Sequence, residues 1–256
     1  MSERDSYLPG TPSWIDLGTS DVDGAAAFYR NLFGWDIPDA APDTGDYRMC
    51  ILRGRPVAGL GPQQNPNQPP WWTTYVSVHS ADETAAAIVA DGGTILVPPM
   101  DVMEFGRMAV AADPCGATFS IWQAGTHIGA GLVNEPGALC WNELTTRHPV
   151  ELVGFYEAVF DWQPVRSDGP MPYTEFQLHG QSVGGMMEMG DQFPLDMPDN
   201  WTVYFAVADC DESAAKVTEL GGTLIMPPTD IPPGRFAVCK DPQGAVFQIL
   251  ALTQEM

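Results

Sequence analysis

Hydrophobic residues recur with two different periods along the chain, and these periods divide it into short strands and helices. A period near 3.6 predicts helices at residues 22–33 and 82–91. Asp21 or Ser20 is a suitable N-cap for the first helix, and Gly92 follows the second. A period of two predicts strands, in order, at 13–18, 47–53, 56–61, 73–78, 94–97, 107–112 and 117–123. These elements form two successive β-α-β-β-β units.

The second half of the chain repeats the first. Trp14-Ile15-Asp16-Leu17 reappears as Trp141-Asn142-Glu143-Leu144, and Phe28-Tyr29 reappears as Phe155-Tyr156. Gly92-Gly93-Thr94 recurs as Gly221-Gly222-Thr223, and Asp113-Pro114-Cys115-Gly116 recurs as Asp241-Pro242-Gln243-Gly244. We therefore expect two similar domains, residues 1–126 and 127–256, with four copies of the β-α-β-β-β unit in all.

The composition limits the partners. The 256 residues carry 11 Lys and Arg against 33 Asp and Glu, a formal net charge of −22. Such a surface repels nucleic acid and anionic membranes. No apolar run approaches the length of a membrane helix, and the N-terminus lacks the pattern of a secretion signal. We expect a cytoplasmic protein, either a monomer or a homodimer.

The cysteines give no sign of a disulfide framework or a zinc knuckle. They are odd in number, and no two of them form a C-x-x-C pair. Their positions are Cys50, Cys115, Cys140, Cys210 and Cys239.

The order of the motifs resembles the vicinal oxygen chelate superfamily. Three motifs, each present twice, support this resemblance: F-Y in the first helix, G-G after the second helix, and D-P-x-G before the last strand. The superfamily includes glyoxalase I, extradiol dioxygenases, fosfomycin-resistance enzymes and bleomycin-resistance proteins, and the tandem form is similar to two-domain glyoxalase-like proteins of actinobacteria. The resemblance implies an α+β fold in which each pair of units forms a half-open barrel around a cavity.

The metal enzymes of that superfamily place three ligands on strands that line the cavity. The matching positions here are Trp14, Thr73 and Ser120 in the first half, and Trp141, Thr202 and Gln248 in the second. Indole, hydroxyl and amide groups are poor ligands for iron, zinc or nickel. The four histidines are expected to be solvated loop residues, and Glu188, near a fourth-ligand position, makes no site alone. We therefore predict no metal and no cofactor.

Strand alternation predicts which other residues line the two cavities. Residues two apart share a face, so Asp16 accompanies Trp14 and Glu143 accompanies Trp141. Met186 adds a deformable wall to the second cavity. The same rule brings in Tyr75 beside Thr73, Trp122 beside Ser120 and Tyr204 beside Thr202. The intervening residues Val76, Val78, Phe119, Phe205, Val207 and Phe247 should pack under the helices.

Three hypotheses follow for function. The first is a metal-free protein that binds a small aromatic or apolar molecule, with the carboxyl groups of Asp16 and Glu143 facing a cationic or hydrogen-bond-donating group. By resemblance to the bleomycin-resistance proteins, this means sequestration of a drug or natural product, or an accessory role in its biosynthesis. The sequence identifies neither the ligand nor whether one or both cavities bind.

The second hypothesis is a glyoxalase-like or hydroxylase-like enzyme acting on a small carbonyl or polyketide-type substrate. It would use Asp16 or Glu143 as a general base, or an unorthodox metal site. The third is a degenerate domain kept for protein–protein contact, with cavities filled by side chains. A purely structural role is also open for the aromatic residues, with both acids bonded to an internal Arg or backbone amide.

Overall fold

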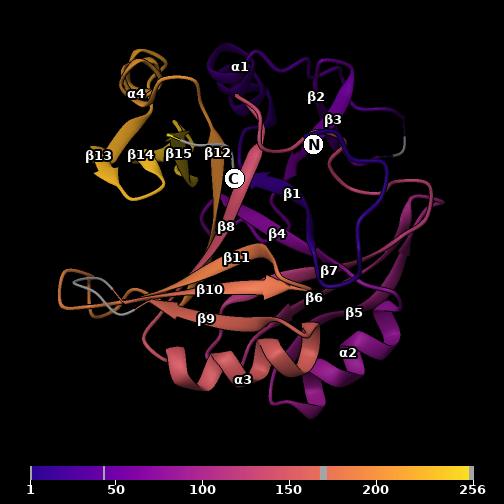
Figure 1. The fold of residues 1–256 in the computed structure, drawn as a ribbon. Helices are drawn as coiled ribbons and strands as arrows, with labels where there is room; N and C mark the ends of the chain where they lie inside the picture. Colours follow the sequence, from indigo (N-terminus) through magenta and orange to yellow (C-terminus); the bar gives the residue numbers. More distant parts are fainter. Residues whose placement is uncertain (1, 43, 168–171, 254–256) are drawn as a thin grey trace.

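The computed structural model describes residues 2–42, 44–167 and 172–253. Each half of the chain forms one curved sheet, and the helices lie on the outer sides of the sheets (Figure 1). The first half contains β1 (Pro12–Thr19), α1 (Val22–Phe33), β2 (Arg48–Leu52), β3 (Arg55–Pro62), β4 (Trp71–Ser77), α2 (Ala81–Ala90), β5 (Thr94–Val102), β6 (Gly106–Ala112) and β7 (Thr118–Ala124). The second half contains β8 (Leu139–Thr146), α3 (Pro149–Phe160), β9 (Gln163–Ser167), β10 (Tyr173–Leu178), β11 (Gln181–Glu188), β12 (Asn200–Ala206), α4 (Cys210–Glu219), β13 (Thr223–Ile231), β14 (Gly234–Lys240) and β15 (Val246–Leu252).

The helix signals in the sequence are confirmed. Helix α1 spans the predicted residues 22–33, and α2 is displaced by one residue from its predicted range. Asp21, rather than Ser20, caps α1, because its side chain accepts a hydrogen bond from the backbone N–H of Gly24 at 2.9 Å. Gly34 ends the helix in the left-handed conformation, with φ of 72°.

Both sheets have the same topology, except that the second has one additional edge strand, β9. The strand orders are β2-β3-β1-β4-β7-β6-β5 and β13-β14-β15-β12-β8-β11-β10-β9. The first strands of two successive units, β1 with β4 and β8 with β12, pair antiparallel in the middle of each sheet. The last strand of each unit then pairs parallel to that unit's first strand, as β7 does with β4. Each sheet therefore curves with its two ends open, and the half-open architecture is confirmed.

The prediction of four complete β-α-β-β-β units is wrong for the first unit. Only β2 and β3 follow its helix, and an isolated bridge between Asp36 and Ile51 stands where the third unit has β9. Pro38 and Pro42 follow this bridge and lack the N–H groups that a longer strand requires.

Two hydrophobic cores join the halves, and each combines residues from both. Helices α1 and α4 lie over one core and α2 and α3 over the other (Figure 1). Tyr29 of α1 packs against Phe247 and donates its hydroxyl to Asp241 at 3.0 Å. Reciprocally, Tyr156 of α3 donates to Asp113 at 2.8 Å. Each half forms its own sheet but depends on the other to bury its helices.

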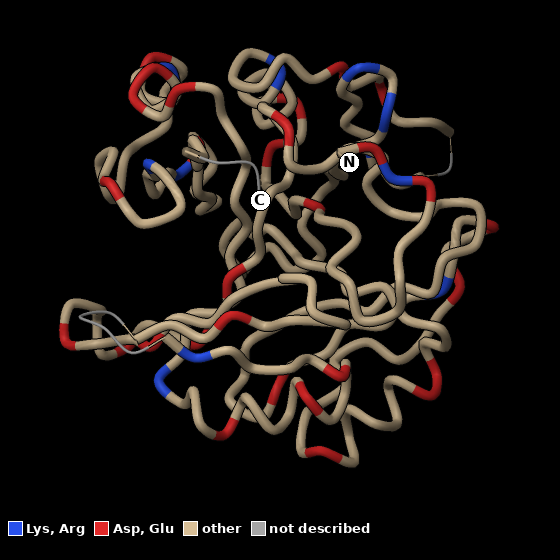
Figure 2. The backbone as a smooth tube through the Cα atoms, in the orientation of Figure 1, with Lys and Arg blue, Asp and Glu red and all other residues tan. Residues whose placement is uncertain are grey.

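Acidic residues cover the outer surface. Figure 2 shows Asp and Glu spread over helices and loops, with few Lys and Arg among them. The cysteines are all free. None of the helices in the described ranges is both long and apolar enough to cross a bilayer.

Candidate functional site

The three cavity-facing strands bring the predicted residues together. In the first sheet, Trp14 pairs with Tyr75 and Asp16 with Thr73, and Tyr75 in turn pairs with Ser120. In the second sheet, Trp141 pairs with Tyr204 and Glu143 with Thr202, and Tyr204 pairs with Gln248. Paired residues on neighbouring strands share a face. Each half therefore presents a tryptophan, a tyrosine and a carboxyl group side by side on its concave face.

The residues between them point to the helices, as predicted. Val76, Val78 and Phe119 lie in the core under α2 and α3, whereas Phe205, Val207 and Phe247 lie in the core shared by α1 and α4.

In the first half, two tyrosine hydroxyls bind the half-buried acid. Tyr75 donates to Oδ2 of Asp16 at 2.8 Å, and Tyr47 approaches the same oxygen at 3.4 Å. The indole N–H of Trp14 donates to the Tyr47 hydroxyl at 3.1 Å. Among the described residues, the acid is therefore held by the hydroxyl groups of Tyr75, Tyr47 and Thr73, with no arginine or backbone amide among its hydrogen-bond partners.

The second half repeats this arrangement. Tyr204 donates to Oε1 of Glu143 at 2.7 Å, and Tyr173 also hydrogen-bonds to Glu143. The indole N–H of Trp141 donates to the Tyr173 hydroxyl at 2.8 Å. The side chain of Gln248 donates to Thr202 at 3.0 Å. A carboxyl group, two phenols and an indole thus form one hydrogen-bonded group in each half.

Sequence reasoning missed Tyr47 and Tyr173. Each phenol lies over a glycine of the neighbouring strand, and a Cβ at Gly59 or Gly185 would lie 1.8 Å from the tyrosine oxygen. The signal was available in the repeat, because both tyrosines stand at matching places before or at the start of the hairpin strand. The residues that flank Tyr47 differ from those that flank Tyr173, so the two tyrosines do not belong to a shared short motif.

Burial raises the pKa of both acids. It raises the pKa of Asp16 from 3.8 to about 6, against the opposing effect of the hydrogen bonds from Tyr75 and Tyr47. Burial raises the pKa of Glu143 in the same direction, against the bonds from Tyr204 and Tyr173. The pKa values of the phenols also lie above their ordinary value, chiefly through burial, so they stay protonated. Near neutral pH, Asp16 can therefore accept or release a proton.

The concave face of the first half is partly covered by residues 127–133, here called the strap. The ring of His127 packs edge-on against Trp14 at 4.5 Å and against Trp122 at 5.9 Å. Ala130 and Val133 complete the cluster, and Trp14 is only 4% exposed. The expectation of a solvated His127 is wrong, because its ring packs against both tryptophans, and burial lowers its pKa to about 4. Asp16 and Thr73 on the same face are half-buried.

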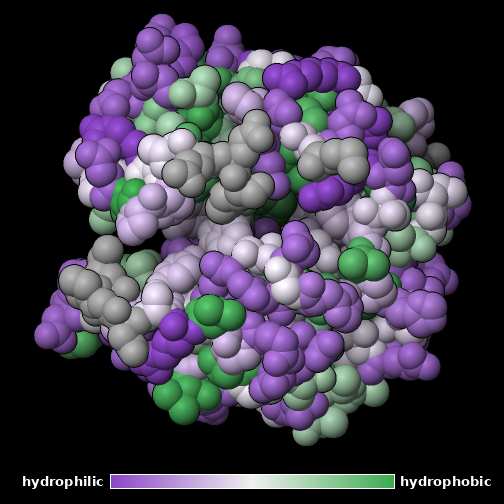
Figure 3. Space-filling model, in the orientation of Figure 1, coloured by the Kyte–Doolittle hydropathy of each residue, from purple (hydrophilic) through white to green (hydrophobic). Residues whose placement is uncertain are grey.

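The concave face of the second half is more open at its tryptophan. Trp141 and Thr202 are half-buried, whereas Glu143 and Tyr204 are 5% exposed. Figure 3 shows the surface hollowed between the β13–β15 end and the β9–β11 end of this sheet. Glu143 lies on the face of β8 opposite the helix-packed core, so it faces this hollow.

One predicted wall residue lies on the wrong face. Met186 is 1% exposed and packs in the core under α2 and α3. It pairs with Leu144, whereas its neighbour Met187 pairs with Thr145 on the concave face. A shift of one residue in register reverses the face of every side chain in a strand, and the sequence did not determine that register.

The concave faces do not fit the metal that the resemblance implies. The six ligand positions offer hydroxyls, an amide and indoles, and the neighbouring carboxyl groups of Asp16 and Glu143 are engaged by tyrosines. Within the described ranges, the one group of three His, Cys, Asp or Glu side chains with converging ligand atoms is Cys115, His148 and Asp199, outside both sites. A Lewis-acid step at the concave face therefore has no ligand set to support it.

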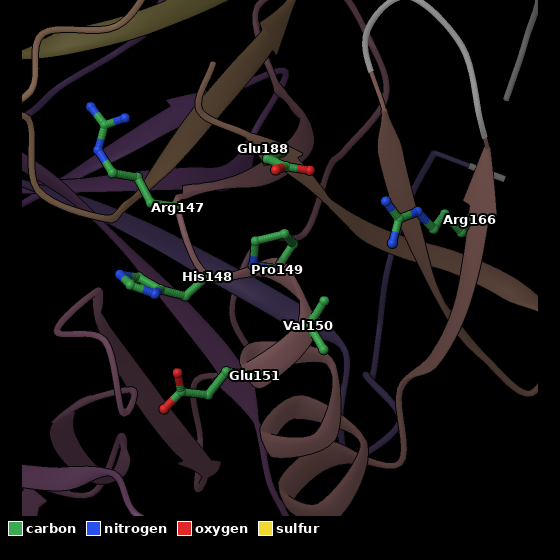
Figure 4. A pocket seen from close by; sticks show the side chains of 7 residues that line it. All are labelled: Arg147, His148, Pro149, Val150, Glu151, Arg166 and Glu188. Atoms are coloured by element: carbon green, nitrogen blue, oxygen red, sulfur yellow. The ribbon is translucent and has the colours of Figure 1, made fainter. Parts of the chain in front are cut away.

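A separate hollow of about 460 Å³ lies at the start of α3. It is lined by Arg147, His148, Pro149, Val150, Glu151, Arg166 and Glu188 (Figure 4). None of the predicted cavity residues lines it. Three of the four histidines, His79, His148 and His179, are exposed as expected.

Comparison with known families matches both halves. The family described as the glyoxalase/bleomycin resistance protein/dioxygenase superfamily matches residues 11–121, and a glyoxalase-like domain family matches residues 140–250.

Curated relatives span the whole chain. CFP32 of Mycobacterium tuberculosis, which bears the name glyoxylase, is 42% identical, over 98% of each chain. The anthracycline biosynthesis proteins DauV of Streptomyces sp. strain C5 and DnrV of Streptomyces peucetius are 35% and 34% identical, over 97% of this chain and 95% of theirs.

Two solved structures share this fold at low sequence identity to the chain. The Mn(II)-bound glyoxalase of Novosphingobium aromaticivorans has a TM-score of 0.67 at 14% identity, over 100% of this chain and 87% of that one. The 2,3-dioxygenase LapB of Pseudomonas sp. KL28 has a TM-score of 0.67 at 15% identity, over 96% and 93% of the two chains. These likenesses establish the fold alone.

Proposed function

The chain belongs to the glyoxalase/bleomycin resistance protein/dioxygenase superfamily, and from this premise we propose that it binds a small aromatic or apolar molecule without a metal. One observation carries the proposal. On the concave face of each half, an indole, two phenols and a buried carboxyl group occupy and surround the positions where metal ligands would stand. Aromatic walls bind flat ligands through stacking and burial of apolar area.

The second half is the stronger candidate for the site. Its tryptophan is half-buried, whereas the strap covers the tryptophan of the first half. The side-chain oxygen of Gln248 is buried without a hydrogen-bond partner among the described residues, so it can accept a hydrogen bond from a ligand. Glu143 offers a second acceptor beside it.

These groups specify the chemical class of the ligand. A flat, fused-ring body fits against the indole, and an amine or hydroxyl donor fits the carboxyl group and the amide oxygen. Anthracyclines have this character, and two of the relatives are named for anthracycline biosynthesis. We place the protein in sequestration of such a compound or in an accessory step of its biosynthesis.

The test is a titration with matched ligands and matched variants. Tryptophan fluorescence and melting temperature are followed while an amine-bearing anthracycline, and the corresponding aglycone without the amine, are added. Tyr204→Phe removes a hydroxyl bound to Glu143, and Tyr75→Phe removes the equivalent hydroxyl in the first half. We expect Tyr204→Phe to weaken ligand binding about tenfold or more, which is the usual size of the loss of a hydrogen bond to a charged group. Tyr75→Phe should change the affinity little.

Two results would contradict the proposal. If a broad panel of flat aromatic ligands leaves emission and melting temperature unchanged, the protein is not a binding protein of this kind. If Tyr75→Phe weakens binding while Tyr204→Phe does not, the first half holds the site and the choice between halves is wrong.

A second candidate function rests on the raised pKa of Asp16. A carboxyl group that titrates near pH 6 is suited to general acid–base catalysis. The corresponding reaction is proton abstraction next to the carbonyl of a small carbonyl or polyketide-type substrate. Hydrogen–deuterium exchange at such a carbon, measured by NMR, tests this function, and Asp16→Asn should abolish the exchange. If exchange persists in both Asp16→Asn and Glu143→Gln, neither acid is the general base.

A further inference from the structure

Cys115, His148 and Asp199 converge at a place that neither concave site uses. Their ligand atoms all lie within 4.8 Å of one another. Cys115 belongs to the turn before β7 in the first half, whereas His148 and Asp199 precede α3 and β12 in the second. The thiol of Cys115 also hydrogen-bonds to the carboxylate of Glu151 on the first turn of α3. The cluster therefore spans the two halves of the protein.

The supporting contacts fix the carboxylate of Asp199. Thr146 donates its hydroxyl to one oxygen of Asp199, and the backbone N–H of Arg147 donates to the other at 3.2 Å. The backbone N–H of His148 donates to the same Thr146 hydroxyl at 2.9 Å. Metal ligands in proteins are commonly held by such outer hydrogen bonds, which reduce the reorganisation needed for binding.

His148 stands where the repeat has a capping residue. Its counterpart Asp21 caps α1 through its side chain, whereas His148 at the N-cap of α3 makes no side-chain cap bond. Histidine is not among the preferred N-cap residues, so this position gives up helix stability and leaves the imidazole available. Figure 4 shows His148 and Glu151 directed to the same side of α3, with Arg147 directed elsewhere.

The counterpart of Cys115 also differs. In the second half the same turn carries Gln243, whose amide donates to Asp21 at 3.3 Å. The equivalent place in the repeat is thus closed by an internal hydrogen bond between an amide and an acid. Where Cys115 meets His148, a thiol stands in place of the Gln243 amide and an imidazole in place of the Asp21 carboxylate. Both are good ligands for zinc.

We propose that Cys115, His148 and Asp199 form a zinc site that ties the two halves together, with Glu151 as a fourth ligand. Thiolate, imidazole and carboxylate are the ligands that zinc takes, in tetrahedral geometry. Zinc–ligand bonds of about 2.0 to 2.3 Å place tetrahedral ligand atoms roughly 3.3 to 3.8 Å apart, so the cluster must tighten by about 1 Å. Because His148 is exposed, its side chain can rotate to do so. The positive end of the α3 dipole disfavours a cation, but three anionic ligands outweigh it.

The experiment is a titration of the full chain, freed of metal, with Zn²⁺ and with Co²⁺. We expect one equivalent of Zn²⁺ to bind in the presence of millimolar Mg²⁺, which occupies sites formed by surface carboxylates alone. Co²⁺ should give a thiolate charge-transfer band together with the intense visible bands of tetrahedral cobalt. Bound Zn²⁺ should also raise the melting temperature, because it links elements from both halves.

Variants separate the site from adventitious binding. His148→Ala should weaken Zn²⁺ binding at least a hundredfold, and it leaves the fold intact because the side chain is exposed and caps nothing. Cys115→Ser should remove the charge-transfer band, and Glu151→Gln should weaken binding less. His179→Ala, an exposed histidine elsewhere, is the matched control. Failure to bind Zn²⁺ over Mg²⁺, or equal effects of His148→Ala and His179→Ala, would overturn the proposal.

Discussion

Replacing Asp16 by asparagine should remove a pH dependence of stability. Asparagine has nearly the same shape, and its side-chain oxygen can still accept hydrogen bonds from Tyr75 and Tyr47. The pKa of Asp16 rises from 3.8 in the unfolded chain to about 6 in the fold, so the folded protein binds this proton more tightly. The free energy of unfolding from this group is therefore largest at low pH and falls as pH rises from about 4 to about 6.

The size of the effect follows from the shift in pKa. A difference of about 2.2 pH units corresponds to about 3 kcal/mol in full. The sequence pI is about 4.1, so the measurement is made between pH 5 and pH 8. Over this range the same shift lowers the free energy of unfolding by about 1.4 kcal/mol. Above pH 7 the carboxyl group is ionised in both the folded and the unfolded chain, so the curve for this group is flat there.

The assay is urea unfolding at several pH values between 5 and 8, comparing the natural protein with Asp16→Asn. The difference between the two curves isolates Asp16 from all other titrating groups, including Glu143. Exposed Asp39→Asn changes the net charge by the same amount and serves as the control. If Asp16→Asn and Asp39→Asn give parallel curves, Asp16 ionises freely in the fold and the arrangement with the tyrosines is wrong.

Three further predictions test the packing between the halves. Tyr29→Phe leaves Asp241 without its buried partner across the halves, so urea unfolding should show a loss of about 1 to 3 kcal/mol; an unchanged midpoint would contradict the shared core. His127→Ala should uncover Trp14, which acrylamide quenching of tryptophan emission detects as increased accessibility; unaltered quenching would mean that the strap does not shield the indole. Residues 1–126 alone should lack a cooperative unfolding transition by circular dichroism, because the core over α1 is completed by residues of the second half; a sharp transition would show that this half folds by itself.

The local sequence pattern was sufficient to predict where the helices and strands lie and which residues of the central strands share a face. The period of the apolar residues and the capping chemistry act over a few residues, so α1 could be placed with Asp21 as its cap. Alternation along β4 and β12 assigned Tyr75 and Tyr204 to the concave face, because a strand has only two faces. Composition at the six ligand positions, read against the family resemblance, indicated that a metal ligand set is missing there.

Contacts between residues far apart in sequence decided the remainder. The face of Met186 depended on the register between β11 and β8, and the bonds from Tyr47 and Tyr173 to the acids depended on a glycine in a neighbouring strand. Nothing local in the strap shows that His127 lies on Trp14.

By itself, then, the sequence determined the repeat, its elements and the chemistry available on each strand, since these depend on neighbouring residues. Only the tertiary structure decided which concave face is covered and that the carboxyl group on each concave face is bound by phenols. It alone also brought Cys115 close to His148 from opposite halves. The physical reason is that packing of the two sheets across shared cores, rather than any local preference, sets these distances.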